Sequence, residues 1–376
     1  MKKIALSISL FVLGYGFVNA QTSSKDSTLQ FSGSADVYYM YDFAESKTNH
    51  VVSSTYTDGL VGTQENTIGF GSLDLKVKKD FNKVSVVGEL NFGPRSNDNT
   101  YAFNNAQFAY YIQNLYFSYQ ALKQLSFSAG AMYKYETYEK LTPVDNFNYL
   151  MSNGFIEMRK VPFRSVGIRG TYTFSDKVSL TAGLYNTINN TGVSTYDVLA
   201  NATPFGLSDF AAQLFVNPIN DLQLSAAVWV EGQKKQGTHL NFQAHYKLNK
   251  GLKLGLDVNN YSGSDTVTQA ANNYSNYTSA ALYAQQSFSK IFTLGLRFEH
   301  ENKQENNDQT TYNTFTKDNY NIITLTGSEK VGGLMIKQEI KYDMTDKNNF
   351  NTPYLNKDSN PTNKDVEFVL AAIYKF

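Results

Sequence analysis

Apolar and polar residues alternate with a period of two along most of the chain. Between residues 31 and 43, Phe31, Val37 and Phe43 fall on one parity, whereas Ser34 and Asp36 fall on the other. An α-helix repeats every three to four residues, so this spacing does not fit a helix. The β-branched and aromatic residues that are frequent in these stretches also favour strands. The pattern therefore predicts an all-β protein.

About sixteen such segments follow one another along the chain, and many have the ~9–11 residues that a tilted strand needs to cross a bilayer. Bacterial outer-membrane barrels have an even number of antiparallel strands. We therefore expect a closed antiparallel transmembrane β-barrel of about sixteen strands, with about 14 to 18 also compatible. The expected strands lie near 29–43, 67–78, 83–92, 111–121, 125–136, 165–174, 178–187, 210–217, 222–231, 238–248, 252–261, 278–288, 291–301, 320–328, 334–343 and 365–376.

The connections between these segments alternate between short and long. The long ones are rich in Asn, Thr, Ser, Asp and Lys, and they lie at 44–66, 93–110, 137–164, 188–209, 262–277, 302–319 and 344–364. The connection at 232–237 breaks the rule, because it is short where a long one is expected. Outer-membrane barrels have short periplasmic turns and longer extracellular loops. With both termini in the periplasm, every long connection then falls outside the cell.

The charged residues of the expected strands share one parity, and the strand cores carry no Lys, Arg, Asp or Glu on the other. A soluble sandwich also alternates, with one face inward and one in water, but it tolerates occasional exceptions. A Lys or Arg that faces lipid at mid-bilayer costs about 2–4 kcal/mol, so a barrel in lipid excludes such positions more strictly. The charged parity would then line the lumen, and the pore-lining candidates are Asp74, Lys76, Glu89, Arg169, Arg297, Glu299, Lys337 and Glu339.

The N-terminus has the features of a targeting segment. Lys2 and Lys3 precede an almost unbroken apolar run, which ends at a small-residue cleavage site before Gln21. The run is too short for a membrane helix, and a polar stretch follows it. We expect residues 1–20 to be a signal peptide cleaved after Ala20, residues 21–28 a short periplasmic segment, and residues 29–376 the barrel.

The composition of the chain excludes several other classes of protein. The 33 Lys and Arg balance 33 Asp and Glu, so the chain has no basic footprint for nucleic acid. The absence of Cys excludes disulfide scaffolds and thiolate metal sites. His239 and His245 share a parity but lie too far apart along a strand to bind one metal ion. No nucleotide or zinc motif is present, and no spacing selects a catalytic pair. We expect no cofactor, no metal and no enzymatic activity; an outer-membrane hydrolase, with a Ser–His or Asp–His pair, is a less favoured alternative.

The last segment ends in alternating apolar residues and a terminal aromatic, Phe376. Such a strand is similar to the signal by which the barrel-assembly machinery recognises outer-membrane barrels. Tyr and Phe also gather near strand ends, as in the aromatic girdles that face the two lipid interfaces. The expected partners are therefore outer-membrane lipid and the assembly machinery, together with small solutes. Whether the protein forms a homo-oligomer stays open, because no separate apolar patch marks a subunit surface.

Three aromatic-rich stretches stand out, LSFSAGAMYKYETYE at 125–139, PVDNFN at 143–148 and PFRSVGIRGTYTFS at 162–175, together with FSGSADVYY at 31–39. The first three resemble the OmpL-like β-barrel porin family of Gram-negative outer membranes, and FSGSADVYY is similar to the family's first strand. The resemblance extends from about residue 29 to the C-terminus and is richest in motifs between about 110 and 187. It implies a porin-like barrel in the outer membrane, and it supplies no catalytic residues and no defined substrate.

These observations predict an outer-membrane channel through which small hydrophilic solutes diffuse passively. The long connection at 137–164 is the candidate constriction loop, and its candidate residues are Glu139, Asp145, Glu157 and Arg159. An exposed surface loop is the alternative for this segment. For the whole protein, one alternative is a non-conducting barrel that acts as an adhesin or structural protein through its extracellular loops. Another, less favoured, is a secreted soluble β-sandwich that binds glycans.

Overall fold

The structure of the chain is a computed structural model. It describes residues 28–43, 66–96, 111–159, 164–186, 207–232, 235–265, 273–309, 312–346, 354–355 and 361–376. The expected signal peptide lies outside the described residues, and so does nearly all of the expected periplasmic segment at 21–28.

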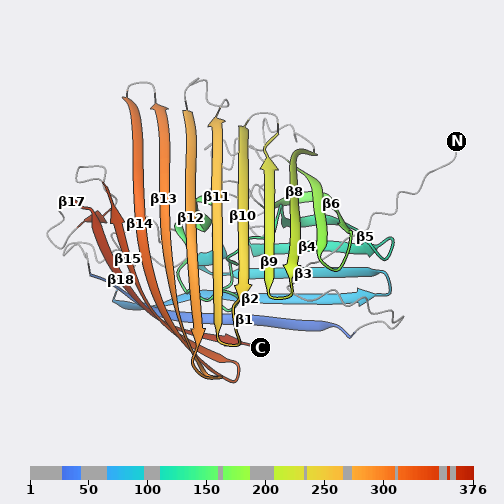
Figure 1. The fold of residues 1–376 in the computed structure, drawn as a ribbon, viewed down its shortest axis with the longest axis horizontal. Coiled ribbons are helices and arrows are strands. Elements are labelled where there is room, and N and C mark those ends of the chain that lie inside the picture. The colour runs from blue at the N-terminus through green and yellow to red at the C-terminus, as the bar shows by residue number, and fades with distance from the viewer. Residues whose placement is uncertain are drawn as a thin grey trace.

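Sixteen strands form one closed antiparallel barrel (Figure 1). Each strand pairs with its neighbours along the chain, and β1 pairs with β18 to close the barrel. The expected fold class and strand number are thereby confirmed. The strands are β1 (Gln30–Asp42), β2 (Thr67–Phe81), β3 (Val84–Phe92), β4 (Ile112–Gln120), β5 (Leu125–Tyr133), β6 (Arg164–Thr173), β7 (Val178–Asn186), β8 (Leu207–Ile219), β9 (Leu222–Val230), β10 (Lys235–Lys247), β11 (Leu252–Asp265), β12 (Asn273–Ser287), β13 (Phe292–Gln309), β14 (Tyr312–Val331), β15 (Leu334–Thr345) and β18 (Lys364–Lys375).

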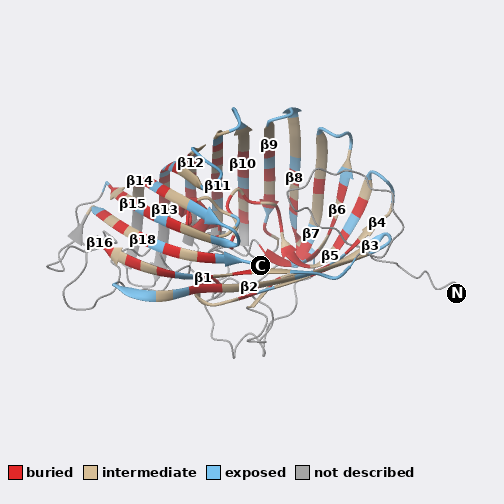
Figure 2. Ribbon diagram, turned by 90° about the horizontal axis from the view of Figure 1, so that it is seen from below, coloured by how far each residue is buried: buried red, intermediate tan, exposed pale blue. Residues whose placement is uncertain are grey.

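The barrel turns its apolar side chains outward and its polar side chains inward. On β13, Leu296 and Phe298 are 47% and 42% exposed, whereas Arg297 and Glu299 are almost fully buried. Figure 2 shows the same alternation as bands of buried and exposed residues along the strands. This is the reverse of a soluble β-sandwich, in which apolar faces pack together in the centre. It suits a barrel surrounded by hydrocarbon, where a closed ladder also leaves no backbone group unpaired at an edge.

Two-residue turns join several strand pairs at one end of the barrel. Phe81 pairs with Val84 around Asn82, which has a φ of 52°. Val331 pairs with Leu334 around Gly332, which has a φ of 61°. Such tight hairpins need left-handed backbone, which Gly adopts freely and Asn adopts more readily than most residues. The short connections predicted from the sequence therefore carry the residue types that their geometry requires.

The hairpin of β13 and β14 is much longer than predicted. The sequence pattern placed a loop at 302–319, but the ladder continues until Gln309 pairs with Tyr312. This part of the prediction is wrong, because apolar and polar residues alternate only where one face of a strand meets lipid and the other meets the lumen. Beyond that portion both faces can be polar, and backbone pairing alone continues the strand.

The segment between β5 and β6 differs from the other connections, because its described part, residues 134–159, lies against the inner face of the barrel wall. It ends in the short helix α1 (Asn153–Arg159), which packs against β12 and β13. Its Met151, Phe155 and Ile156 belong to one buried cluster with Trp229 and Tyr185 of the wall. The largest apolar cluster of the described residues is thus formed by this loop and the inner wall together. We call residues 134–159 the inner loop.

The remaining described elements are small. The 3₁₀-helix η2 (Pro94–Ser96) follows β3, and β16 (Tyr354–Leu355) pairs with β17 (Pro361–Thr362) between β15 and β18. Among the described residues, no helix has the length and apolar character that a transmembrane helix needs.

Candidate functional site

The inner loop begins with a buried charge that is held by β8 and β9, a few strands away from β5 around the barrel. The ammonium group of Lys134 donates to the Asp209 carboxylate of β8 and lies 3.8 Å from the ring centroid of Trp229 on β9. Burial lowers the pKa of Lys134, whereas the charge of Asp209 opposes this shift. A buried ammonium is tolerated when a carboxylate and an aromatic face surround it. These contacts direct the chain away from β5 and into the barrel.

A second set of contacts fixes the middle of the inner loop to β12 and β13. Arg297 forms ion pairs with Glu139 of the loop at 2.9 Å and with Glu299 of its own strand at 2.6 Å. Glu139 also accepts hydrogen bonds from the Ser152 backbone N–H at 2.7 Å and from the Tyr283 hydroxyl at 3.1 Å. Every one of these charged groups therefore has a partner of opposite charge.

A third set of contacts connects the loop backbone to β15. Glu339 accepts hydrogen bonds from the backbone N–H groups of Tyr149 and Leu150, both at 2.8 Å. Lys337 donates to the carbonyl oxygens of Pro143 and Asn146 at 2.6 and 2.7 Å. A buried loop has backbone groups that no ladder satisfies. Here the charged side chains of the wall supply the missing donors and acceptors.

The loop also reaches β1. The hydroxyl of Tyr149 donates to the Asp36 carboxylate at 2.6 Å. The guanidinium of Arg95, which belongs to η2, lies 3.7 Å from the same carboxylate and 4.6 Å from the Tyr149 ring centroid. From its root on β5, the inner loop thus touches β8, then β12, β13 and β15, and finally β1. In the barrel these strands belong to one continuous stretch of wall, which runs from β8 through β15 and β18 to β1, so the inner loop is held along more than half of the circumference.

The eight pore-lining candidates are all on the inward parity, but the structure brings only some of them together. Arg297, Lys337 and Glu339 bind the inner loop as described above, and Glu299 accepts a hydrogen bond from the Asn153 backbone N–H at 2.8 Å. Beyond β1, Lys76 of β2 pairs with Glu89 of β3 at 3.2 Å, and Asp74 accepts a long hydrogen bond from Asn91 at 3.5 Å. Arg169 of β6 stands apart and donates to the Tyr133 carbonyl at the root of the loop.

The four candidate constriction residues of the inner loop have different environments. Glu139 is buried among the contacts of Arg297. Asp145 is exposed and lies 3.6 Å from Lys375, near the C-terminus. Glu157 and Arg159 belong to α1, and their side chains lie outside the described residues.

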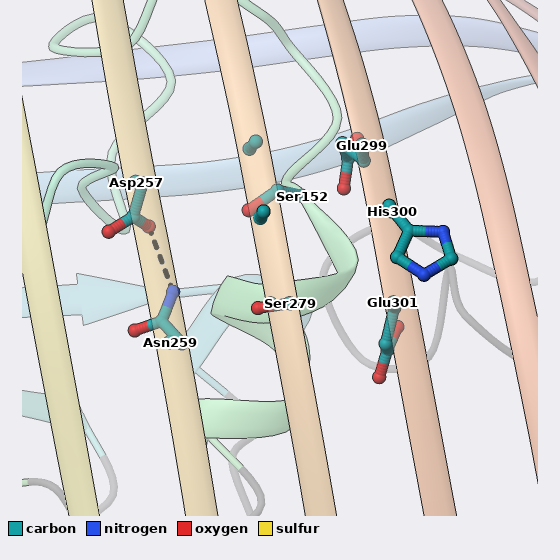
Figure 3. Close-up of a pocket in the computed structure, with 10 residues that line it drawn as sticks. Ser152, Asp257, Asn259, Ser279, Glu299, His300 and Glu301 are labelled. Carbon is teal, nitrogen blue, oxygen red and sulfur yellow. Dashed lines mark hydrogen bonds between the residues drawn. The ribbon is translucent and has the colours of Figure 1, made fainter.

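A polar recess lies where α1 meets the inner faces of β11, β12 and β13 (Figure 3). Asp257 of β11 accepts hydrogen bonds from Asn241 and Asn259 there, at 2.7 and 3.1 Å. Glu299 and Ser279 line the same recess. The neighbouring His300 has the outward parity and is exposed. The recess extends the acidic and amide lining of the inner wall.

The two histidines on the inward face of β10 have different partners. His239 is buried, and its ring nitrogens contact the hydroxyls of Tyr135 and Tyr277 at 3.0 and 3.2 Å. His245 stacks on Tyr138 of the inner loop. Across the described part of the chain, no three His, Asp or Glu side chains are arranged to hold a metal ion.

Several interior residues were not singled out by the sequence pattern. Arg95 and Tyr149 lie outside the strands, so parity could not select them. Lys341 of β15 pairs with Asp343 and with Glu367 of β18, at 2.6 and 3.4 Å. These three residues share the charged parity of the strands, but nothing in the sequence distinguished them from their neighbours as interacting residues. Parity identifies the inward face, and it does not identify which inward residues meet.

Solved structures with a similar fold are outer-membrane proteins. OmpT of Vibrio cholerae, described as the trimer form, aligns with a TM-score of 0.59 and 12% identity, covering 93% of this chain and 99% of that one. The outer-membrane channel DcaP of Acinetobacter baumannii aligns with a TM-score of 0.58 and 13% identity, covering 93% and 97%. An anion-selective porin from Comamonas acidovorans gives 0.59 and 10%, covering 94% and 100%. At such identities the likeness shows the fold alone.

The sequence itself matches a family model over nearly its whole length. The model described as "Putative beta-barrel porin-2, OmpL-like" covers residues 28–376. No curated protein matches the sequence.

Proposed function

Since the chain belongs to the OmpL-like porin-2 family and is thus an outer-membrane porin, we propose that it conducts small hydrophilic solutes by passive diffusion past the inner loop. The observation that carries this proposal is the arrangement of the barrel interior. Its wall is polar and charged, and the inner loop is held inside the lumen by buried contacts with β8, β13, β15 and β1. Selectivity in such a channel comes from lumen charge and from the narrowest section.

The pore-lining candidates have two roles in this proposal. Arg297, Glu299, Lys337 and Glu339 hold the loop, and they shape the channel through it. Lys76 of β2 and Glu89 of β3 are on the inward face and bind each other rather than the inner loop, and we propose that passing solutes meet them. Support comes from the partial exposure of the Lys76 side chain, at 41%. Glu139, Asp145, Glu157 and Arg159 remain the proposed constriction residues.

The route to the membrane is part of the same proposal. Residues 1–20 would be removed after Ala20, and residues 21–28 would lead into β1. The C-terminal strand would be recognised by the barrel-assembly machinery through Phe376, whose ring stacks on Phe31 of β1 with centroids 5.9 Å apart. The outward apolar surface would then meet outer-membrane lipid. By analogy with the trimer form of OmpT, we further propose that the porin forms a homo-oligomer.

A channel of this family and fold is not expected to catalyse a reaction, and we propose no enzymatic activity. Each buried charge discussed above is explained by the inner loop or by a neighbouring strand. No catalytic step is needed to account for these groups.

The direct experiment is conductance across a planar lipid bilayer. The detergent-purified, folded protein should insert and produce stepwise, ohmic increases in current in potassium chloride. Vesicles that contain it should also swell in solutions of small sugars. A barrel that folds, inserts and never conducts would contradict the proposal and would favour the adhesin or structural alternative.

A further inference from the structure

One aromatic residue of the inner loop is held between two rings of the wall. The ring of Tyr138 stacks on His245 of β10, with centroids 4.3 Å apart and planes 5° apart. Its other face stacks on Tyr283 of β12, at 4.3 Å and 20°. His245 and Tyr283 are the two cross-strand partners of Gly255 on β11. The three rings therefore form a row across three adjacent strands, with Tyr138 above the glycine.

Gly255 provides the space that Tyr138 occupies. A Cβ atom on Gly255 would lie 1.7 Å from the Tyr138 hydroxyl oxygen and 2.5 Å from its Cζ atom. Glycine weakens a strand, because it costs conformational entropy and offers no side chain for packing. Its presence on the inward face is explained by the close approach of the loop.

A second notch of the same kind lies on β13. A Cβ atom on Gly295 would lie 2.1 Å from the ring of Phe147, which also belongs to the inner loop. Two outward glycines, Gly88 and Gly327, differ from these inward ones. A Cβ atom on Gly88 would meet nothing within 4 Å, and one on Gly327 would meet no atom closer than 3.6 Å. At Gly255 and Gly295, loop rings fill the inward space, whereas the two outward positions have room for a methyl group.

Each notch stands beside a polar contact of the loop. Tyr138 directly precedes Glu139, which pairs with Arg297. Phe147 directly precedes Asn148, which donates to the Thr326 hydroxyl at 2.7 Å. Displacing either ring would move the adjacent polar group by a comparable distance and would break its contact. The rings therefore set where the polar contacts can form.

We infer that Tyr138 and Phe147 are positioning residues that seat the inner loop in the glycine notches at Gly255 and Gly295, and that this seating sets the upper size of solutes that pass. The inference rests on the proposed channel function. It makes the inner loop a fixed constriction, because both rings would have to leave occupied notches before the loop could swing aside.

The test compares Gly255→Ala and Tyr138→Ala with Tyr138→Phe, and uses Gly88→Ala and Gly327→Ala as matched controls. Folding is first checked by the shift in gel mobility between unheated and heated samples. Two readouts follow on each folded variant. One is vesicle swelling in neutral sugars of increasing size, and the other is hydrogen exchange of backbone amides in residues 134–159.

Gly255→Ala and Tyr138→Ala should admit sugars that the wild type excludes, and their loop amides should exchange about fivefold faster, because the ring contacts are lost. Tyr138→Phe, which keeps the ring, should resemble the wild type, and so should both controls. If Gly255→Ala does not fold, Tyr138→Ala decides alone, because truncating a loop side chain leaves the barrel ladder intact.

Wild-type size limits and wild-type exchange rates in a folded Tyr138→Ala variant would overturn the inference. A wild-type protein that never conducts would instead overturn the proposed channel function. The exchange measurement would still report whether the rings seat the loop, so the two failures are distinguishable.

Discussion

At the scale of single residues, Arg297 shows how charge is tolerated inside the barrel. It is fully buried, yet it faces two carboxylates and donates to the Leu150 carbonyl at 2.8 Å. Burying a charge is costly unless a partner and hydrogen bonds compensate for it. The stability of the interior therefore depends on complete sets of partners, and loss of one member leaves the others uncompensated.

Replacing Arg297 by Met should destabilise the folded barrel by about 3–5 kcal/mol, because Glu139 and Glu299 lose their shared cation. Equilibrium unfolding in urea from lipid vesicles measures this change. The control is Lys78→Met, which removes a half-exposed pair with Asp80 at 3.1 Å and should cost less than about 1 kcal/mol. Equal losses of unfolding free energy in the two variants would show that the buried ion pairs stabilise the barrel no more than a half-exposed pair does.

At the scale of elements, the inner loop has its own internal ion pair. Lys140 donates to the Glu136 carboxylate at 3.0 Å and to the Thr137 carbonyl at 2.8 Å. Burial raises the pKa of Glu136, but the charges of Lys140 and Arg169 outweigh burial, and the net pKa lies below its ordinary value of 4.5. The ionised carboxylate therefore favours the folded loop.

A carboxylate with a lowered pKa contributes stability above the pKa of the unfolded chain and loses it as pH falls through the folded value. Acidification below pH 4.5 should thus loosen the loop around Glu136. Hydrogen exchange of residues 134–159, corrected for intrinsic rates, should rise in acid for the wild type and less for Glu136→Gln. An identical rise in both proteins would assign the acid response to other groups.

The sequence predicted the strands far better than it predicted the contacts of the inner loop. Parity selected Arg297 and Glu299 as inward residues, and composition selected Glu139 as a loop residue. Arg297 and Glu139 are 158 residues apart in the chain, and no local sequence pattern predicts a contact over such a separation. The glycines at 255 and 295 were present in the strand pattern, but their purpose appears only when the loop rings are placed above them.

At the scale of the whole molecule, the apolar exterior is the property on which the membrane assignment depends. Leu296 of β13 and Ile340 of β15 are 47% and 48% exposed, and they flank the outward Leu325 of β14. In water such a surface would be unfavourable over this many strands. In hydrocarbon it needs no further cover.

Leu296→Lys should therefore lower the stability of the barrel in lipid vesicles by about 2–4 kcal/mol, since the ammonium group would face lipid. Leu122→Lys is the matched control, because Leu122 lies in the turn between β4 and β5 and is 60% exposed. Unfolding titrations of both variants in the same vesicles measure the difference. An unchanged free energy of unfolding in the Leu296→Lys variant would indicate that water, not lipid, surrounds the outward face of β13.

The pattern of apolar and polar residues was sufficient to predict the all-β class, the number of strands and the direction in which each strand side chain points. These follow from a two-residue period, which every strand needs when lipid lies on one side and polar surroundings on the other. The path of the inner loop, the partners of its charges and the length of β13 and β14 became visible only in the folded chain. Those features depend on residues brought together by closure of the barrel, or on backbone pairing that continues where both faces of a strand are polar.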